Sequence, residues 1–244
     1  FSEYAVIDRL KIISNFSGSA GLAVILKKNN YLFVDGRYTI QAQQQSGKQF
    51  KIIEIHKFLP HSLIKNLTLG FDPNLLTKRQ LYGYFGKFLE LKQINNNLID
   101  EIYKKRNLRA KKFFSLSSKV TGKSFKSKIN KIRNILKLNK TDYLFVSAPE
   151  NVAWVLNIRG SDNPNSPIPN CRLIIGKNKE LFLITQKEKV SKIIKDRKLS
   201  KKQIINPEKF EHLIKKLKGK KFIIDTLSCS VFNENIIKSK FKIS

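Results

Sequence analysis

The chain has 244 residues, 41% of them hydrophobic, which is enough for one large domain or two ordinary ones with real cores. No apolar run approaches the ~18 residues that a membrane-spanning helix needs, and no secretory signal is visible, so we expect no membrane partner. The net charge of +30 would suit a nucleic-acid binder, but only nine of the 48 basic residues are arginine and the lysines are scattered. We therefore expect weak, salt-sensitive polyanion binding but no specific nucleic-acid partner.

The cysteines and the two ends of the sequence bear on its origin. Cys171 and Cys229 are far apart and follow no ligand spacing, so we expect buried, inert thiols and a reducing, cytoplasmic compartment. The sequence contains no methionine, begins abruptly and has no obvious ending. We therefore expect it to be a piece of a longer protein.

The first half of the chain is expected to alternate strands and helices. Apolar runs at Leu22–Leu26 and Tyr31–Val34, separated by Lys-Lys-Asn-Asn, predict two strands joined as a hairpin. The following Asp35-Gly36 predicts a turn into a helix, in which Asp35 caps the helix and Gly36 permits a positive φ. Further predicted elements are short strands at residues 50–56, 68–73 and 88–96, and a helix at 74–89 with Thr77 as an irregularity.

The second half is expected to repeat this mixed pattern. A charged stretch at 98–118 that ends in serines is interpreted as a linker, with a new domain from Phe113. Apolar spacing from Phe125 to Leu138 predicts an amphipathic helix, with Asn139 near its end. Hairpins force antiparallel neighbours, so each half predicts a mixed β-sheet flanked by helices, which is an α/β fold. The remaining predicted elements are strands at 142–148, 171–176, 180–185 and 220–225, and helices at 149–158, 190–199 and 208–217.

Motifs that suggest chemistry fit structural roles better. Gly-Lys-Ser at 122–124 lacks the glycine that a phosphate-binding loop has five residues earlier, where Ser117 stands, so a capped helix start is preferred. The histidines, His56, His61 and His212, are scattered, and we predict neither a metal site nor a catalytic residue in this chain.

The most unusual segment is residues 151–169, which carries the only tryptophan, then Asn-Ile-Arg-Gly-Ser-Asp, then three prolines. We interpret it as a helix that carries Trp154 into a core, a turn at Gly160 and a proline-stiffened connection to the next strand.

Four segments together resemble the cytosolic, three-domain Xaa-Pro aminopeptidases (aminopeptidase P). They are Phe16–Ile25, Tyr31–Gln45, Thr121–Arg133 and Asn151–Ile168. The resemblance implies two consecutive creatinase N-terminal-like domains, 1–112 with a truncated start and 113–244, complete or short of its last elements. It also implies that the C-terminal pita-bread domain is absent from this chain.

The resemblance further implies a metal-dependent peptidase that releases the N-terminal residue from peptides with proline in second place. Its two divalent metal ions, commonly manganese, would be bound by Asp, His and Glu ligands of the absent domain, and no position here matches them. Implied partners are the chain's own C-terminal catalytic domain, a second subunit in a homodimer, and the peptide substrate. Arg37, Arg159 and Asp162 are candidates to face the substrate cleft, with structural roles as the alternative. A free-standing basic α/β module that binds polyanions or serves as an oligomerisation scaffold is the alternative function.

Overall fold

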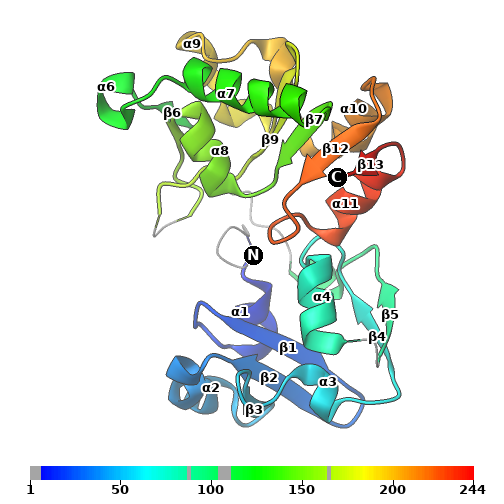
Figure 1. The fold of residues 1–244 in the computed structure, drawn as a ribbon. Coiled ribbons are helices and arrows are strands. Elements are labelled where there is room, and N and C mark those ends of the chain that lie inside the picture. The colour runs from blue at the N-terminus through cyan, green and yellow to red at the C-terminus, as the bar shows by residue number, and fades with distance from the viewer. Residues whose placement is uncertain (1–6, 87–88, 104–110, 164–165) are drawn as a thin grey trace. The chain divides into compact units, whose positions relative to one another are not determined.

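The computed structural model describes residues 7–86, 89–103, 111–163 and 166–244 (Figure 1). The chain divides into two compact units, Phe1–Asn107 (unit 1) and Leu108–Ser244 (unit 2). The predicted linker includes residues 104–110, which lie outside the described residues, so the predicted boundary at 112 and 113 stays a prediction.

Unit 1 contains a three-stranded sheet and a separate two-stranded sheet among its described residues. Its elements are α1 (Arg9–Ser14), β1 (Gly21–Ile25), β2 (Asn30–Val34), the 3-10 helix η2 (Gly36–Tyr38), α2 (Thr39–Ser46), β3 (Lys51–Glu54), α3 (Pro60–Leu63), β4 (Thr68–Phe71), α4 (Lys78–Phe85), β5 (Glu90–Gln93) and α5 (Leu98–Ile102). β1 is antiparallel to β2, β3 is parallel to β2, and β4 is parallel to β5. The predicted hairpin and the predicted short strands are therefore confirmed.

Unit 2 contains a six-stranded mixed sheet in the order β11-β10-β9-β7-β12-β13, and a small β6-β8 pair. Its strands are β6 (Phe114–Ser115), β7 (Tyr143–Val146), β8 (Ile158–Arg159), β9 (Arg172–Gly176), β10 (Leu181–Ile184), β11 (Ile204–Ile205), β12 (Lys221–Ile224) and β13 (Lys242–Ile243). Its helices are α6 (Ser118–Thr121), α7 (Phe125–Leu138), α8 (Pro149–Leu156), η3 (Lys187–Lys189), α9 (Ser191–Lys195), η4 (Lys201–Gln203), η5 (Pro207–Lys209), α10 (Phe210–Lys216) and α11 (Val231–Lys238). The prediction of a mixed sheet flanked by helices is confirmed.

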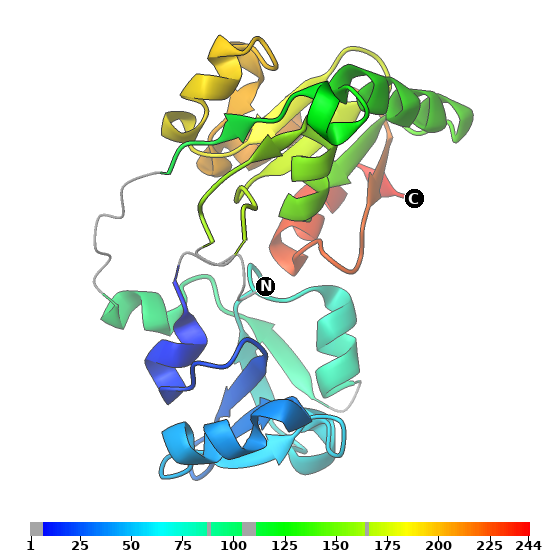
Figure 2. The ribbon, with the colours of Figure 1, turned by 90° about the vertical axis from the view of Figure 1, so that its left-hand side faces the viewer.

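The core of unit 2 lies on both faces of this sheet. Along β9, Leu173 and Ile175 belong to one buried cluster and Ile174 to another, because successive strand residues point to opposite faces. Figures 1 and 2 show α7 and α8 on one side of the sheet and α10 and α11 on the other. Each fully buried aliphatic or aromatic side chain contributes about 1.5–3 kcal/mol of transfer free energy.

Polar side chains set where the helices begin. Ser124 accepts a hydrogen bond from the amide of Ser127 and so starts α7 at Phe125, as the capped-helix reading of Gly-Lys-Ser predicted. The predicted helix at 74–89 is longer than the observed α4. Thr77 forms a capping box with Gln80, so α4 begins only at Lys78. Gly36 has no positive φ, so that expectation for the Asp-Gly turn is wrong.

The two units share one order of elements. The series α1-β1-β2-α2-β3-α3-β4-α4-β5 corresponds in order to α8-β9-β10-α9-β11-α10-β12-α11-β13. The pairing directions also correspond, since β9 and β10 are antiparallel, while β10 with β11 and β12 with β13 are parallel. We infer that unit 1 and unit 2 are two versions of the same supersecondary plan.

Local sequence supports this correspondence. Both α1 and α8 end at an asparagine in the left-handed region, Asn15 (φ 61°) and Asn157 (φ 52°). From this asparagine onward the sequence is Asn-Phe-Ser-Gly-Ser in unit 1 and Asn-Ile-Arg-Gly-Ser in unit 2. Phe16 and Ile158, which directly follow the asparagine in unit 1 and unit 2, both have fully buried side chains.

Candidate functional site

The first candidate site is the corner of unit 1 where β2 ends and η2 begins. The Asp35 carboxylate accepts hydrogen bonds from the backbone amide of Arg37 at 3.0 Å and from its Nε at 2.8 Å. The Asp35 side chain therefore both caps the turn and holds the guanidinium of Arg37. The Arg37 side chain is 76% exposed. The predicted capping role of Asp35 is confirmed.

The electrostatics of this corner keep both groups charged. The hydrogen bonds from Arg37 lower the pKa of Asp35 to about 2, and the same contact raises the pKa of Arg37. The imidazole of His56 is a further neighbour, because its Nε2 lies 3.6 Å from Asp35 Oδ2. The guanidinium is thus a permanent, oriented and solvent-facing charge with five potential donors, two of which Asp35 engages.

The corner also brings together two of the motifs that carried the resemblance. The Tyr38 hydroxyl lies 2.8 Å from Ser19 Oγ, and the Arg37 guanidinium carbon lies 5.6 Å from the Tyr38 ring centroid. Phe16 packs edge-on against Tyr38. Gly18 makes this turn feasible, because a Cβ there would lie 2.2 Å from the Phe16 ring.

A cavity of about 540 Å³ adjoins Asp35 and His56 within unit 1. Other polar side chains at its wall are Arg9, Gln80 and Tyr84, and the remaining lining is mostly apolar. This combination can bind and orient an organic ligand with a few polar groups. The described residues contain no group of three or more His, Cys, Asp or Glu that could hold a metal ion.

The second candidate site, in unit 2, contains Arg159 and Asp162. Arg159 is half-buried, and its Nη1 donates to the carbonyls of Ile158 (2.8 Å) and Ala153 (3.4 Å). The Asp162 side chain is 10% exposed, and its Oδ1 lies 2.7 Å from Lys189 Nζ. Its Oδ2 accepts a hydrogen bond from the Asn170 amide at 2.7 Å. Asp162, near the start of the segment that follows Gly160, therefore binds Asn170 at the end of that segment and Lys189 beyond it.

Trp154 does not lie in the core, and that prediction is wrong: its side chain is 59% exposed. The buried face of α8 is formed by Val152, Ala153, Val155 and Leu156, so the tryptophan falls on the solvent face. Its ring covers the ammonium of Lys128, which lies 4.1 Å from the ring centroid.

Two lysines, the buried Lys128 and the half-buried Lys198, satisfy the C-terminal carbonyls of α8. Lys128 Nζ donates to Trp154 O at 2.8 Å and to Asn157 Oδ1 at 2.6 Å. Lys198 Nζ donates to Leu156 O at 3.1 Å and to Asn157 O at 2.9 Å. Cations suit the negative end of a helix dipole, although burial lowers the pKa of both lysines. These two lysines could not be predicted, because nothing local in the sequence links them to α8.

The cysteines behave as expected. Cys171 and Cys229 are buried and form no disulfide, and burial raises the pKa of the Cys171 thiol. Among the described residues, no helix has both the length and the apolar character that crossing a bilayer requires.

Comparison with known proteins extends these observations. Residues 8–101 and 104–244 match two family models, each described as a creatinase/prolidase N-terminal domain. Xaa-Pro aminopeptidase 1 of Dictyostelium discoideum is 31% identical over 233 residues, which cover 82% of this chain and 34% of the relative. Aminopeptidase P1 of Lotus japonicus is 32% identical over 209 residues, which cover 80% of this chain and 31% of the relative. The chain thus spans about a third of the length of these relatives.

A solved structure shares the fold. It is the X-prolyl aminopeptidase of Caenorhabditis elegans, described as a cytosolic enzyme with a di-nuclear active site. It covers 99% of this chain with a TM-score of 0.82 and 24% sequence identity, while the match spans 43% of that protein. The fold of both units therefore occurs within a larger protein.

Proposed function

We propose a function from the premise that this chain belongs to the creatinase/prolidase N-terminal domain family. We infer that its 244 residues are the two N-terminal units of an Xaa-Pro aminopeptidase, which releases the first residue from peptides with proline second. Support comes from the names of the relatives and from the fold shared with the Caenorhabditis elegans enzyme. That enzyme is described as cytosolic, and we assign the parent of this chain to the cytoplasm as well.

We place the metal chemistry in the part of the parent beyond these units. The described residues do not fit a dinuclear centre, since they gather no set of three His, Cys, Asp or Glu. The C-terminal domain would hold two divalent ions, manganese by the family resemblance, and these would supply the activation of water. The role left for this chain is to shape the substrate cleft and to make subunit contacts in a homodimer.

Arg37 is the side chain through which we expect unit 1 to act on the substrate cleft. The carrying observation is that Asp35 holds its guanidinium in place while the side chain stays 76% exposed. A guanidinium that is oriented in advance and still hydrated suits recognition of a peptide carbonyl or carboxylate. Arg159 is the next candidate, whereas the near-burial of Asp162 favours a role in positioning the segment after Gly160.

The decisive experiment compares two proteins on an Xaa-Pro peptide with added manganese. The 244-residue chain should show no turnover, and the same chain continued by its natural downstream residues should hydrolyse the bond before proline. Turnover by the 244-residue chain alone would contradict the assignment of catalysis to the downstream part. An inactive longer protein would contradict the aminopeptidase assignment itself.

The net charge of +30 favours a second candidate, a basic α/β module that binds polyanions or acts as an oligomerisation scaffold. Nucleic-acid binding measured at two salt concentrations separates the cases. Binding that collapses by about 0.2 M salt is the electrostatic attraction expected of any such chain, whereas sequence-selective binding that survives it would favour the module.

A further inference from the structure

Lysines that are scattered in the sequence gather at one edge of the unit 2 sheet. β7, β12 and β13 run parallel to one another, so they begin at the same edge. The turn from β9 to β10 reaches that edge as well, because β9 is antiparallel to β7. Eleven of the twenty residues in the four segments at this edge are lysine, and two are acidic. We refer to these segments as the lysine edge: 137–142, 177–180, 215–221 and 240–242.

Contacts with Asp142 hold three of these segments together. Its Oδ2 accepts hydrogen bonds from the amides of Lys220 and Lys221 at 2.7 and 3.0 Å. Its Oδ1 lies 2.7 Å from Lys177 Nζ. Gly219 permits the close approach, because a Cβ there would lie 2.9 Å from the carboxyl carbon of Asp142. The lysines of the edge therefore start from fixed backbone positions.

Most of the positive charge at the lysine edge has no carboxylate beside it. Lys177 pairs with Asp142, and Lys215 pairs with Glu211. Within the part of the chain that the structure describes, the other lysines of the edge form no ion pair, and all of them are exposed. They are Lys137, Lys140, Lys179, Lys216, Lys218, Lys220, Lys221, Lys240 and Lys242. The ends of α7 and α10 account for Lys137 and Lys216, since cations suit the last turn of a helix, but not for the rest.

Two of the unpaired lysines are placed where like charges repel. Lys221 of β12 and Lys242 of β13 are direct partners in neighbouring strands, and like charges in such positions are unfavourable. The backbone keeps them there, because the amide of Lys242 donates to the carbonyl of Lys220 at 2.8 Å. An anionic partner would therefore relieve a repulsion that the folded chain contains.

The residue types at the lysine edge indicate which anion fits. Lysine is a point charge on a flexible stem and binds phosphate, whereas arginine, which recognises bases and carboxylates in a bidentate manner, is absent from the four segments. The aromatic residues at these strand ends, Tyr143, Phe222 and Phe241, are buried in the core. These rings are therefore not available to stack on a base or to enter a bilayer.

The size and charge of the edge suit a duplex. The strands in the order β9-β7-β12-β13 span about 14 Å at roughly 4.8 Å per strand spacing. A duplex carries one negative charge per ~1.7 Å of its axis, which is about eight phosphates over that length. Eleven lysines and two acidic residues leave a charge of +9 at the edge, which is of similar size.

We propose that the lysine edge binds the phosphate backbone of a nucleic-acid duplex without reading its bases. The ammonium groups displace the counterions that are condensed on the phosphates, so the binding is strong at low salt and independent of sequence. It differs from the general attraction of a basic chain because it is confined to one edge of unit 2. It goes beyond the peptidase assignment and does not depend on it.

Fluorescence anisotropy with a labelled RNA duplex of about 20 base pairs tests where the charge acts. The edge variant carries four substitutions, Lys179→Gln, Lys218→Gln, Lys221→Gln and Lys242→Gln. The matched control loses the same charge at exposed lysines elsewhere, through Lys27→Gln, Lys65→Gln, Lys126→Gln and Lys195→Gln.

The two variants should differ clearly. At about 0.1 M salt the edge variant should bind the duplex roughly thirtyfold or more weakly than the unchanged chain, and the control should stay within about threefold. The slope of log Kd against log salt should fall by about three in the edge variant alone, because each lost phosphate contact removes about one. Equal weakening in both variants would show that binding follows the net charge and would overturn the proposal.

Further measurements separate folding and other partners from this result. Urea unfolding followed by Trp154 fluorescence should show an edge variant at least as stable as the unchanged chain, because glutamine removes charge but no backbone bond. The smaller variant Lys179→Gln with Lys242→Gln should lose about half as much slope. Vesicles containing phosphatidylserine that bind the unchanged chain more tightly than the duplex does would assign the edge to a membrane surface and overturn the proposal. A preference of more than about tenfold for one duplex sequence would contradict binding to the backbone alone.

Discussion

Unit 1 and unit 2 follow the same order of strands and helices but differ in how completely their sheets are built. In unit 2 the central strand β7 joins β9 to β12, and Phe145 at its middle is fully buried. In unit 1 the strands on either side of that position are present, and an apolar groove lies between them. A single central strand can therefore decide whether apolar residues on the neighbouring strands form a closed core or an exposed surface.

The units also differ in how they use their polar side chains. In unit 2, Arg159 donates to nearby carbonyls and Asp162 pairs with Lys189, so both charges are committed to internal contacts. In unit 1, Asp35 orients Arg37 but leaves it in solvent. The charges of Arg159 and Asp162 therefore serve the internal structure of unit 2, whereas the guanidinium of Arg37 in unit 1 is available to a ligand.

The largest effect is expected from weakening β7, the central strand of the unit 2 sheet. Phe145→Ala removes a ring that packs against Phe210 at 5.2 Å and should destabilise unit 2 by about 3–5 kcal/mol. Urea unfolding followed by Trp154 fluorescence reports this directly, because the only tryptophan lies in unit 2. Phe232→Ala, at a 42% exposed position, is the matched control and should cost far less. Similar losses in both variants would contradict the central role of β7.

A second large effect should follow from breaking the buried pair of Asp162 and Lys189. Asp162→Ala leaves the Lys189 ammonium buried without its carboxylate and should cost about 3 kcal/mol in the same unfolding experiment. The double variant Asp162→Leu with Lys189→Met should recover most of that loss, because it removes both charges. A single variant as stable as the unchanged chain would show that Asp162 is not a structural support and would favour a role in the cleft.

Asp142 should make the stability of unit 2 depend on acid pH. Burial raises its pKa, but hydrogen bonds from Lys177 and from the amides of Lys220 and Lys221 outweigh this and lower the pKa to about 2. The folded-state pKa lies below the unfolded value of about 3.9, so the stabilisation is present above pH ~4 and is lost as the pH falls towards 2. Asp142→Asn should cost about 1–2 kcal/mol at pH 7, after allowance for solvent. Unfolding curves should show this gap closing between pH 4 and 2, and a constant gap would contradict the assigned cause.

The sequence predicted those parts of this comparison that depend on local periodicity. The spacing of apolar residues was sufficient for the β1–β2 hairpin and for α7, because both patterns repeat within the element. Short helices such as α1 and α5 were missed, since about one turn carries little periodic signal. Trp154 was misplaced because its adjacent residues are apolar, although the polar Glu150 and Asn151 lie one turn earlier on the same exposed face of α8.

The candidate sites were predictable only as motifs. Asp35 and Arg37 are two residues apart, so the turn chemistry of Asp-Gly-Arg-Tyr was sufficient to predict the capping by Asp35. The partner of Asp162 is Lys189, 27 residues away, and such a contact depends on strands closing into a sheet. The apolar groove between β1 and β4 was also unforeseen, because its walls come from segments that are far apart in the sequence.

A moderate effect is expected when the exposed charge of unit 1 is removed from the full-length enzyme. Arg37→Ala should lower kcat/KM for an Xaa-Pro peptide about tenfold, because the guanidinium is proposed to contact the substrate cleft. Arg79→Ala, another exposed arginine of unit 1, is the matched control and should leave kcat/KM unchanged. Thermal unfolding should be unaffected in both, since Arg37 makes its contacts in solvent. Equal kinetics for the two variants would remove Arg37 from the cleft.

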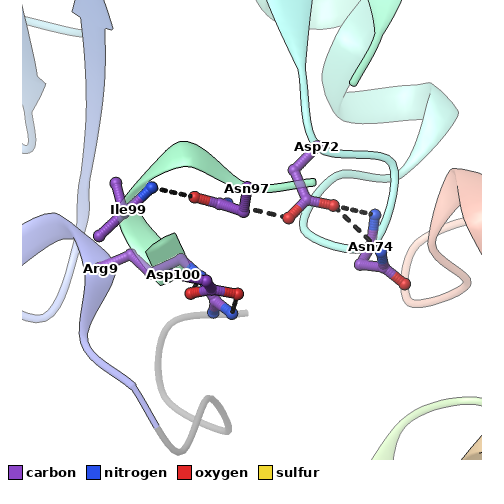
Figure 3. A network of polar contacts seen from close by, with 6 residues as sticks. All are labelled: Arg9, Asp72, Asn74, Asn97, Ile99 and Asp100. Atoms are coloured by element: carbon purple, nitrogen blue, oxygen red, sulfur yellow. Dashed lines mark hydrogen bonds and ion pairs between the residues drawn. The ribbon is translucent and has the colours of Figure 1, made fainter. Parts of the chain in front are cut away.

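The smallest effect should come from the ion pair between Arg9 of α1 and Asp100 of α5. Arg9→Gln removes the two-point contact with Asp100, a partly exposed pair for which about 0.5–1 kcal/mol is expected at low salt. The loss should shrink as salt is raised, because exposed charges are screened, whereas the loss in Phe145→Ala should not. Because α5 is also tied to the end of β4 through Asn97 and Asp72 (Figure 3), Arg9→Gln should speed amide exchange in β4 more than in β2. Faster exchange in both strands by the same factor would show that the pair stabilises unit 1 as a whole and does not act on β4 in particular.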